Sequence, residues 1–467
     1  MMVIKSDSHL RLGLIAGFLL LFACSAKAQQ DTLFWFAAPD VTRGHTDRPI
    51  FLRLSTDSIA ASVRVRMPAD PLGIDTTVNL STFDVSNIDL TPYIDRIEPM
   101  APDTILPAGI LITASAQIGA YYEVKSRRNN TDIFSLKGQN ALGKEFLIPF
   151  QKRWNTATKY RPQAYSGLEI LATRNGTLIT IDPSANVVGH GKLPFSFIMN
   201  EGETYSLRAT SLKAKDRLSG SLVTSNKPIA ITLTDDSAEN GIYGGCKDLM
   251  GDQLIPARVI GREYVVVRGR LNKRQGIGDQ IIIMAHTDTT DIYVNGAYQT
   301  QLQRGQQYSY ALNANAAYVE ASNKVYVTHL TGFGCETGTA AIPALYFTGS
   351  NYVSFTRSKT EDFFLLAMAP SNIVDHFTLN NSIILLQGTD FKNVPGTGGQ
   401  WKYCFKKYNN TDVVTGSASR LDNSKGFFHM GIINGGRRSG TMYGFFSNFY
   451  NVKTGPIYHL ETPKPQN

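Results

Sequence analysis

Three short landmarks recur in this chain in the same order, roughly 100 residues apart, and they constrain the fold more than any other feature. The landmarks, with one further echo between the last two, are residues 143–148 (GKEFLI) with 261–266 (GREYVV), 170–181 (ILATRNGTLITI) with 283–294 (IMAHTDTTDIYV), 202–206 (GETYS) with 305–309 (GQQYS), and 225–227 with 322–324 (both SNK). Their offsets are 118, 113, 103 and 97 residues, as expected when loops of different length join strands in a shared order. A chain built from such repeats usually presents surfaces and does not usually enclose a catalytic centre.

The segments around the landmarks are typical of β-strands. Runs such as 229–234 (IAITLT) and 264–268 (YVVVR) are rich in β-branched and aromatic residues, and 177–181 alternates polar with apolar positions. Turn signals separate the runs, and we expect Gly176, which follows Asn175, to occupy a hairpin turn with positive φ. Because no long amphipathic helix is indicated beyond the N-terminal segment, the predicted fold class is all-β.

Weaker copies of the landmarks extend the series on both sides. Residues 363–367 and 375–381 resemble the second landmark, and residues 113–120 resemble the segment 224–231. Four units are therefore predicted, at 29–140, 141–258, 259–347 and 348–460, with a short tail to residue 467. The favoured arrangement is tandem antiparallel β-sandwich-like units packed side by side. The alternative is a β-propeller in which each repeat supplies more than one four-stranded blade.

The N-terminal segment is typical of a secretory signal peptide. Lys5 and Arg11 precede the apolar stretch 12–23, and residues 26–28 (AKA) place small side chains before the expected cleavage point. This stretch is too short to span a bilayer, and no other apolar run is long enough, so we expect residues 1–28 to be removed and the mature chain to lack a transmembrane segment. Lipidation at Cys24 is the alternative, because residues 21–24 (LFAC) loosely resemble a lipoprotein cleavage site. We expect an exported protein, extracellular or on the outer cell surface, with the periplasm as the other compartment.

The charge balance is mildly basic. The formal net charge is +8, and it becomes +6 without residues 1–28, which carry three cationic side chains and one anionic side chain. The densest cluster is 268–274 (RGRLNKR), which we interpret as a solvated loop, with contact to a polyanion as the alternative. Nucleic acid is not an expected partner of an exported protein.

Three cysteines remain after residue 28, namely Cys246, Cys335 and Cys404. A chain of this length with so few cysteines is not a disulfide-stapled scaffold and depends on packed cores. Cys246 and Cys335 follow the third landmark in successive repeats, so a disulfide between them is a candidate that depends on their distance in the fold.

Motifs of catalysis and cofactor binding are absent from the sequence. It contains no H-E-x-x-H, no G-x-S-x-G, no P-loop and no paired C-x-x-C, and its histidines are spread singly. We therefore assign no catalytic residue and no cofactor, and we expect the protein not to be an enzyme.

One acidic segment is the weak candidate for a metal site. Residues 235–253 gather five acidic side chains in a glycine-rich stretch that we expect to be a long connection between two units. The candidate Ca²⁺ ligands are Asp235, Asp236, Glu239 and Asp252, because hard oxygen ligands on a flexible loop suit this ion. Acid–base catalysis is another alternative. The favoured interpretation is structural, with Asp235, Asp236 and Asp252 accepting hydrogen bonds from backbone N–H groups at the repeat boundary.

Several strings along the chain resemble the N-terminal region of the IgGFc-binding protein family. The matching strings are 170–177 (ILATRNGT), 200–205 (NEGETY), 225–230 (SNKPIA), 235–237 (DDS), 248–253 (DLMGDQ), 331–336 (TGFGCE), 348–350 (TGS) and 353–357 (VSFTR). Together they cover about residues 141–400. A cysteine commonly precedes the Thr-Gly-Ser string in the family, and this chain has Phe347 there, so the resemblance implies that a disulfide through that position cannot form.

The resemblance implies an extracellular, non-enzymatic binding module. Animal members of the family are mucus-associated glycoproteins named for binding the Fc part of immunoglobulin G, and similar domains occur in exported bacterial proteins. No residue set that defines immunoglobulin binding is matched here, so that activity is not carried over. We expect a secreted or cell-surface binding or adhesion protein that contacts an extracellular protein or glycan. The alternatives are a structural component of a bacterial cell-surface assembly and a hydrolase of envelope or host glycans acting through residues 235–252.

Overall fold

The computed structural model describes residues 30–126, 130–240, 245–272, 278–437 and 439–449. Residues 1–28 and Cys24, with their predicted roles in export and lipidation, lie outside this range. The described chain is almost entirely antiparallel β-structure, with one short helix, α1 (Ile94–Ile97), and a few 3₁₀ turns. The prediction of an all-β chain of repeated units is confirmed.

The second unit shows how the repeat is built. Its strands are β9 (Gly143–Leu147), β11 (Ser166–Ala172), β12 (Thr177–Asp182), β13 (Phe195–Met199), β14 (Thr204–Arg208), β15 (Leu222–Glu239) and β16 (Lys247–Gln253). The long strand β15 belongs to two layers: its first half pairs with β12 and β9, and its second half pairs with β11 and β16. The pairing of β15 with β9 is interrupted between Thr224 and Ile229, where Pro228 has no N–H to donate. The Ser-Asn-Lys landmark therefore lies where one layer passes into the other.

The first and third units repeat this order. The first unit contains β1 (Asp31–Phe36), β2 (Ile50–Thr56), β3 (Ala61–Arg66), β4 (Asp75–Leu80), β5 (Val85–Asp89), β7 (Ile110–Val124) and β8 (Asp132–Ser135). The third contains β17 (Gly261–Val267), β19 (Gln280–Ala285), β20 (Thr290–Val294), β21 (Ala297–Leu302), β22 (Gln307–Ala311), β23 (Ala316–Gly334) and β24 (Glu336–Ala341). β7 and β23 take the place of β15, each pairing with strands of two layers.

The fourth unit splits the long strand in two. It contains β25 (Tyr352–Thr356), β26 (Asp362–Pro370), β27 (Phe377–Leu379), β29 (Trp401–Tyr408), β30 (Ala418–Asn423), β31 (His429–Gly436) and β32 (Gly440–Phe445). β30 and β31 lie in separate sheets of three and five strands. Four short strands complete the fold: β6 (Ile105–Leu106), β10 (Asn155–Thr156), β18 (Arg270–Leu271) and β28 (Lys392–Asn393). Because β6 pairs with β14 of the second unit, the division into separate domains at residues 140, 258 and 347 stays a prediction.

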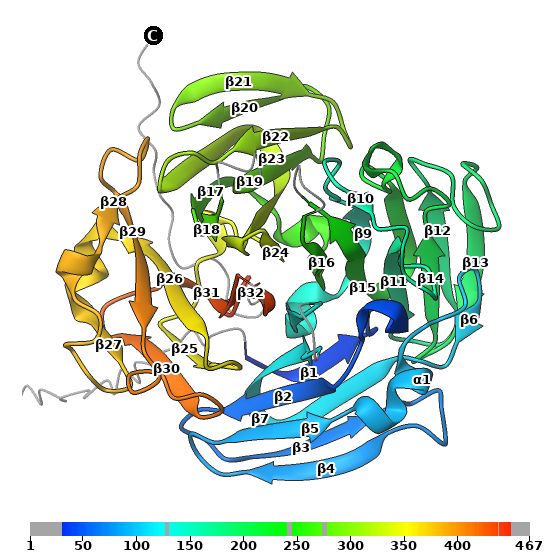
Figure 1. Ribbon diagram of the computed structural model, residues 1–467, viewed down its shortest axis with the longest axis horizontal. Coiled ribbons are helices and arrows are strands. Elements are labelled where there is room, and N and C mark those ends of the chain that lie inside the picture. Colours follow the sequence, from blue (N-terminus) through cyan, green and yellow to red (C-terminus); the bar gives the residue numbers. More distant parts are fainter. Residues whose placement is uncertain (1–29, 127–129, 241–244, 273–277, 438, 450–467) are drawn as a thin grey trace, which may run out of the picture.

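The four units lie around a common centre (Figure 1). Four inner strands meet there, with β8 against β16, β16 against β24, β24 against β32, and β32 against β8. Each unit thus has the two-layer form of the sandwich-like prediction, and the units are arranged about an axis as in the propeller alternative.

Burial follows the strand pattern. In β12, Thr177, Ile179 and Ile181 are buried while Leu178 and Asp182 are exposed, as period-two alternation requires. One large apolar core is shared mainly by the second and third units, and the first and fourth units have cores of their own. No helix in the part of the chain that the structure describes is long and apolar enough to cross a membrane.

Candidate functional site

The acidic segment is a strand pair and not the long loop that we expected. Asp235 and Asp236 lie near the end of β15, and Asp252 lies in β16, so only residues 240–246 connect the two strands. The loop prediction was wrong because the local composition, rich in Asp and Gly, does not show which distant residues pair with the carboxylates. Here those partners come from other parts of the fold and satisfy the carboxylates within a sheet.

The four candidate metal ligands have different partners and do not share one site. Asp235 forms an ion pair with Arg217 at 2.7 Å and accepts a hydrogen bond from the Gln151 amide at 2.6 Å. Glu239, which is partly exposed, pairs with Lys247 at 2.8 Å. Metal binding by this segment stays a prediction, and the contacts found are those of a structural role.

Two of these acids accept backbone hydrogen bonds from neighbouring units. Asp252 accepts the N–H of Ala341 in β24 at 3.0 Å and pairs with the buried Lys137 ammonium at 2.6 Å. Asp236 accepts the N–H of Thr42 in the first unit at 2.7 Å. Burial raises the pKa of Asp236 to about 7, and its hydrogen bonds only partly oppose that effect.

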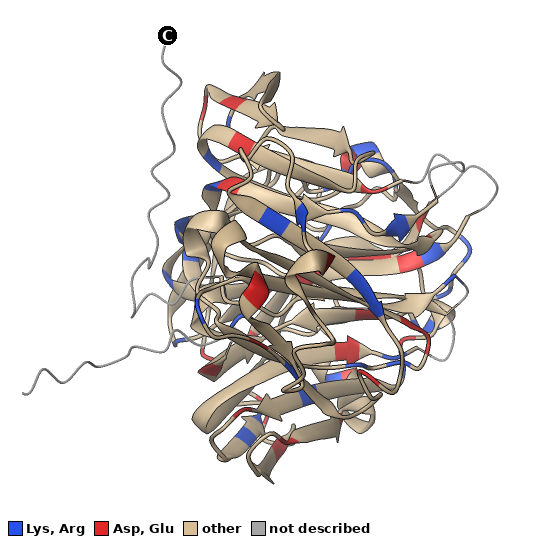
Figure 2. Ribbon diagram, turned by 90° about the vertical axis from the view of Figure 1, so that its left-hand side faces the viewer, with Lys and Arg blue, Asp and Glu red and all other residues tan. Residues whose placement is uncertain are grey.

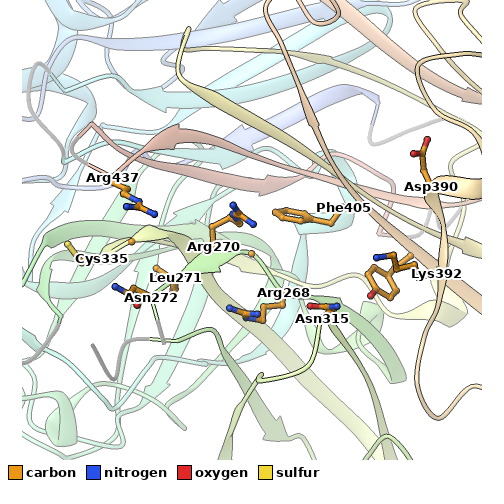
Figure 3. Close-up of a pocket in the computed structure, with 13 residues that line it drawn as sticks. Arg268, Arg270, Leu271, Asn272, Asn315, Cys335, Asp390, Lys392, Phe405 and Arg437 are labelled. Atoms are coloured by element: carbon orange, nitrogen blue, oxygen red, sulfur yellow. The ribbon is translucent and has the colours of Figure 1, made fainter. Parts of the chain in front are cut away.

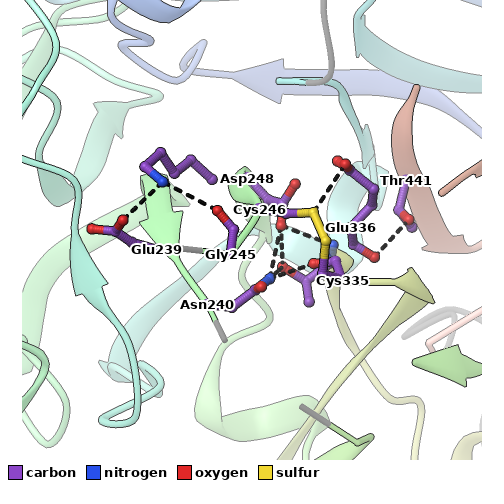
Figure 4. The surroundings of a disulfide bond; sticks show 10 residues. Glu239, Asn240, Gly245, Cys246, Asp248, Cys335, Glu336 and Thr441 are labelled. Atoms are coloured by element: carbon purple, nitrogen blue, oxygen red, sulfur yellow. Dashed lines mark hydrogen bonds and ion pairs between the residues drawn. A yellow bond between two sulfur atoms is a disulfide. The ribbon is translucent and has the colours of Figure 1, made fainter. Parts of the chain in front are cut away.

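Cys246 and Cys335, the candidate disulfide pair, are bonded to each other, with Cα atoms 5.5 Å apart. The bond ties the connection after β15 to the start of β24, beside a buried polar cluster from two units (Figure 4). Asp248 accepts the backbone N–H of Thr337 at 3.0 Å, and burial together with the nearby Glu336 raises its pKa well above the ordinary value. Within the described ranges, these two sulfur atoms and Glu336 are the one group with metal-ligand spacing, and bonded sulfur atoms are not thiolate ligands.

An open cavity of about 810 Å³ lies between the third and fourth units (Figure 3). Its wall from the third unit includes Arg268 and Arg270, and its wall from the fourth includes Lys392, Phe405 and Arg437. Arg270, Lys392 and Arg437 are exposed, whereas Arg268 is partly buried. Lysines, arginines, aspartates and glutamates are otherwise interspersed over the ribbon (Figure 2), so the cavity is a local concentration of cations.

The short strand β18 places Arg270 in the cavity wall. It pairs in parallel with the end of β23, and Leu271 is buried in a small apolar cluster, so the alternating side chain of Arg270 points the other way. Gly269, just before β18, lies very close to β23. A larger residue would not fit, because a Cβ atom at this position would lie 2.0 Å from Oγ1 of Thr331. The Gly269 N–H also donates to Asp279 at 2.6 Å, which fixes the chain just before β18.

Aromatic rings support the Arg270 guanidinium. It lies 5.6 Å from the centre of the Phe364 ring, and that ring stacks on Phe405 with centroids 4.6 Å apart and planes 5° apart. A cation over an aromatic face is attracted by the ring quadrupole, so this stack holds the charge in place without an anionic partner.

The cations of the cavity lack carboxylate partners. Among the residues described, Arg268, Arg270, Lys392 and Arg437 form no ion pair, and the one carboxylate of the wall, Asp390, pairs with Lys406 at 2.7 Å. The sequence indicated part of this site through the cluster 268–274, of which residues 273–274 lie outside the described range. It gave no signal for Lys392 and Arg437, because packing of the fourth unit against the third brings them near.

A smaller cavity of about 330 Å³ at the junction of the first and second units is lined by three acidic and two basic side chains. Asp40, Glu169 and Asp236 line it together with Arg208, which pairs with Asp40. Burial raises the pKa of Glu169 to about 8, and its Oε2 atom has no hydrogen-bond partner among the described residues.

A family model described as IgGFc binding protein matches residues 134–430, which is more than half of the chain. The match begins in β8, crosses the second and third units, and ends in β31 of the fourth. It includes both walls of the larger cavity except Arg437. No curated protein matches the chain. The family is one of non-catalytic binding proteins, and the match shows that this chain belongs to the IgGFc-binding protein family.

Proposed function

We propose that the protein is an exported, non-catalytic binding protein that contacts an extracellular protein or glycan through the cavity between the third and fourth units. The observation that carries this proposal is the set of four cations that line the cavity and form no ion pair with any residue that the structure describes. Cations left without partners beside an open cavity of this size are available to a ligand. The family, which is one of binding proteins, supports the same class of function.

A binding screen tests this function. The purified protein is immobilised and offered a glycan array and a set of extracellular proteins, beside Arg270→Glu and a control variant, Arg174→Glu. Arg174 is exposed, lies on the connection between β11 and β12, and is not part of the cavity. We expect at least one ligand that the protein and the control bind and that Arg270→Glu binds at least ten-fold more weakly. Absence of any ligand on either panel contradicts the proposal.

Location is tested separately. Cell fractionation followed by protease treatment of intact cells should find the protein outside the inner membrane or in the medium. A purely structural component of a surface assembly would show the same location but no soluble ligand, which is how the array separates the two functions.

A further inference from the structure

We propose that the ligand of the larger cavity is a polyanionic glycan, a polysaccharide with sulfate or carboxylate groups that lies across the junction of the third and fourth units. This inference rests on the proposed binding function and adds the chemistry of the ligand. It is carried by the charge, the aromatic surface and the size of the cavity.

Charge is the first argument. Arg268, Arg270 and Arg437 present guanidinium groups, whose planar forks match sulfate and carboxylate groups in a bidentate way. Lys392 is the fourth cation of the cavity. Asp390, the carboxylate among the described lining residues, pairs with Lys406 and so does not repel an entering anion. Cations from both units thus face the same space, and their mutual repulsion is relieved when an anion enters.

The aromatic surface is the second argument. Phe405 and Tyr403 line the same cavity, and Phe405 is held by its stack on Phe364. Phe405 lies beside the guanidinium of Arg270 in the cavity (Figure 3). An apolar ring face beside a cation suits a sugar unit that carries an anionic group, since the ring covers the apolar face of the sugar while the cation binds its charge.

Size is the third argument. The cavity of about 810 Å³ is far larger than a single sulfate or phosphate ion and falls in the upper range of small-ligand sites. The cations are also distributed over both walls instead of converging on one point. A chain of several charged sugar units fits this distribution, and an acidic peptide is the competing occupant that the experiment has to separate.

The test measures binding of three probes of similar length: heparin as the sulfated polysaccharide, poly-glutamate as the acidic peptide, and dextran as the neutral polysaccharide. We expect heparin to bind, with an affinity that falls steeply between 50 and 500 mM NaCl because salt screens these charges. Dextran should not bind, and poly-glutamate should bind at least ten-fold more weakly than heparin. Heparin should also raise the melting temperature, because it binds the folded chain.

Variants locate the site. Arg270→Glu and Arg437→Glu should each weaken heparin binding at least ten-fold and flatten its salt dependence, while Arg174→Glu should bind like the wild type. Both cavity arginines are exposed, so melting temperatures near that of the wild type should show that the variants fold. Phe405→Leu should weaken binding several-fold without changing the salt dependence, because it removes a ring face and no charge.

Each other result has a definite meaning. Heparin binding that survives both charge reversals, or poly-glutamate binding as tight as that of heparin, overturns the polyanionic-glycan inference. A neutral glycan or a protein found by the array, with no heparin binding, overturns the inference and leaves the proposed function standing. Absence of every ligand overturns both.

Discussion

The carboxylate of Asp132 accepts the backbone N–H of Tyr443 at 3.3 Å and so joins β8 of the first unit to β32 of the fourth. It also accepts the N–H of Ile133 at 2.8 Å. One fully buried side chain therefore joins two inner strands where the circle of units closes.

Loss of this carboxyl group should weaken the closed arrangement. Asp132→Ala leaves buried N–H groups without an acceptor, so we expect the free energy of unfolding to fall by about 1–3 kcal/mol. Asp132→Asn keeps one acceptor oxygen and should lose less. Urea unfolding measures both, and Asp75→Ala, which breaks an exposed ion pair with Arg64, is the control, expected to leave the free energy of unfolding nearly unchanged. Equal losses in the three variants would contradict this role of Asp132.

Stability should fall as the pH rises from 6.5 to 8.5. Burial raises the pKa of Glu169 from 4.5 to about 8, so the folded chain keeps a proton that the unfolded chain has released. Unfolding then releases protons in this range, and each such carboxyl lowers stability by up to about 1.4 kcal/mol per pH unit. Asp236, with a pKa of about 7 for the same reason, acts in the same direction.

Variants identify the groups responsible for this slope. Glu169→Gln removes the titration and should flatten the dependence of melting temperature on pH, whereas Glu361→Gln, at an exposed position, should not. Burial lowers the pKa of His429 to about 3, and this opposing effect acts only below the ordinary histidine value of 6.5, outside the range chosen. Rising stability between pH 6.5 and 8.5 would show that these carboxyl groups are not buried as found.

Chelators should leave the melting temperature unchanged. Asp235 and Asp252 are neutralised by Arg217 and Lys137, so the acidic segment needs no cation to balance its charge. Scanning calorimetry with and without EDTA checks this. A decrease that added Ca²⁺ reverses would establish a metal site in place of the ion pairs.

Gly176→Val should lower stability by about 1–2 kcal/mol, because φ at this position is +61° and a β-branched residue is strained there. The nearest atom to an added Cβ is the Lys227 ammonium nitrogen at 3.6 Å, so crowding contributes little. Gly176→Asn is the matched variant, expected to cost less since asparagine tolerates this conformation. Similar melting temperatures for the two variants would exclude backbone strain as the cause.

The same glycine shows what local sequence predicts. Its positive φ was predicted correctly from Asn175-Gly176, but the hairpin was not: β11 and β12 on either side of it do not pair with each other, and both pair with β15. A turn signal predicts the backbone conformation of the turn itself. The pairing of the flanking strands depends on β15, which comes much later in the chain. The repeat itself was readable, since Ile179 and Ile292 lie in the corresponding strands β12 and β20.

The binding site was harder to predict from the sequence, because it too depends on contacts between distant parts of the chain. Arg268 and Arg270 stood out as a cluster in the chain, but their exposure to a cavity depends on β18 pairing with β23 and on Leu271 turning inward. The acidic segment was predicted as a loop because local composition does not show its partners: Lys137, which pairs with Asp252, comes from the first unit, and Arg217, which pairs with Asp235, precedes β15. A buried ion pair leaves no periodic signal along the chain.

Closure between Asp132 and Tyr443 also sets the order of events during biosynthesis, since these residues are 311 positions apart. The ribosome completes the first unit long before the strand that will cover its inner edge exists. Until β32 is made, the nascent polypeptide carries an unprotected β edge, which is prone to aggregation and accessible to proteases. Truncated translation products that end before β32 should therefore be degraded even when their first three sheets have formed.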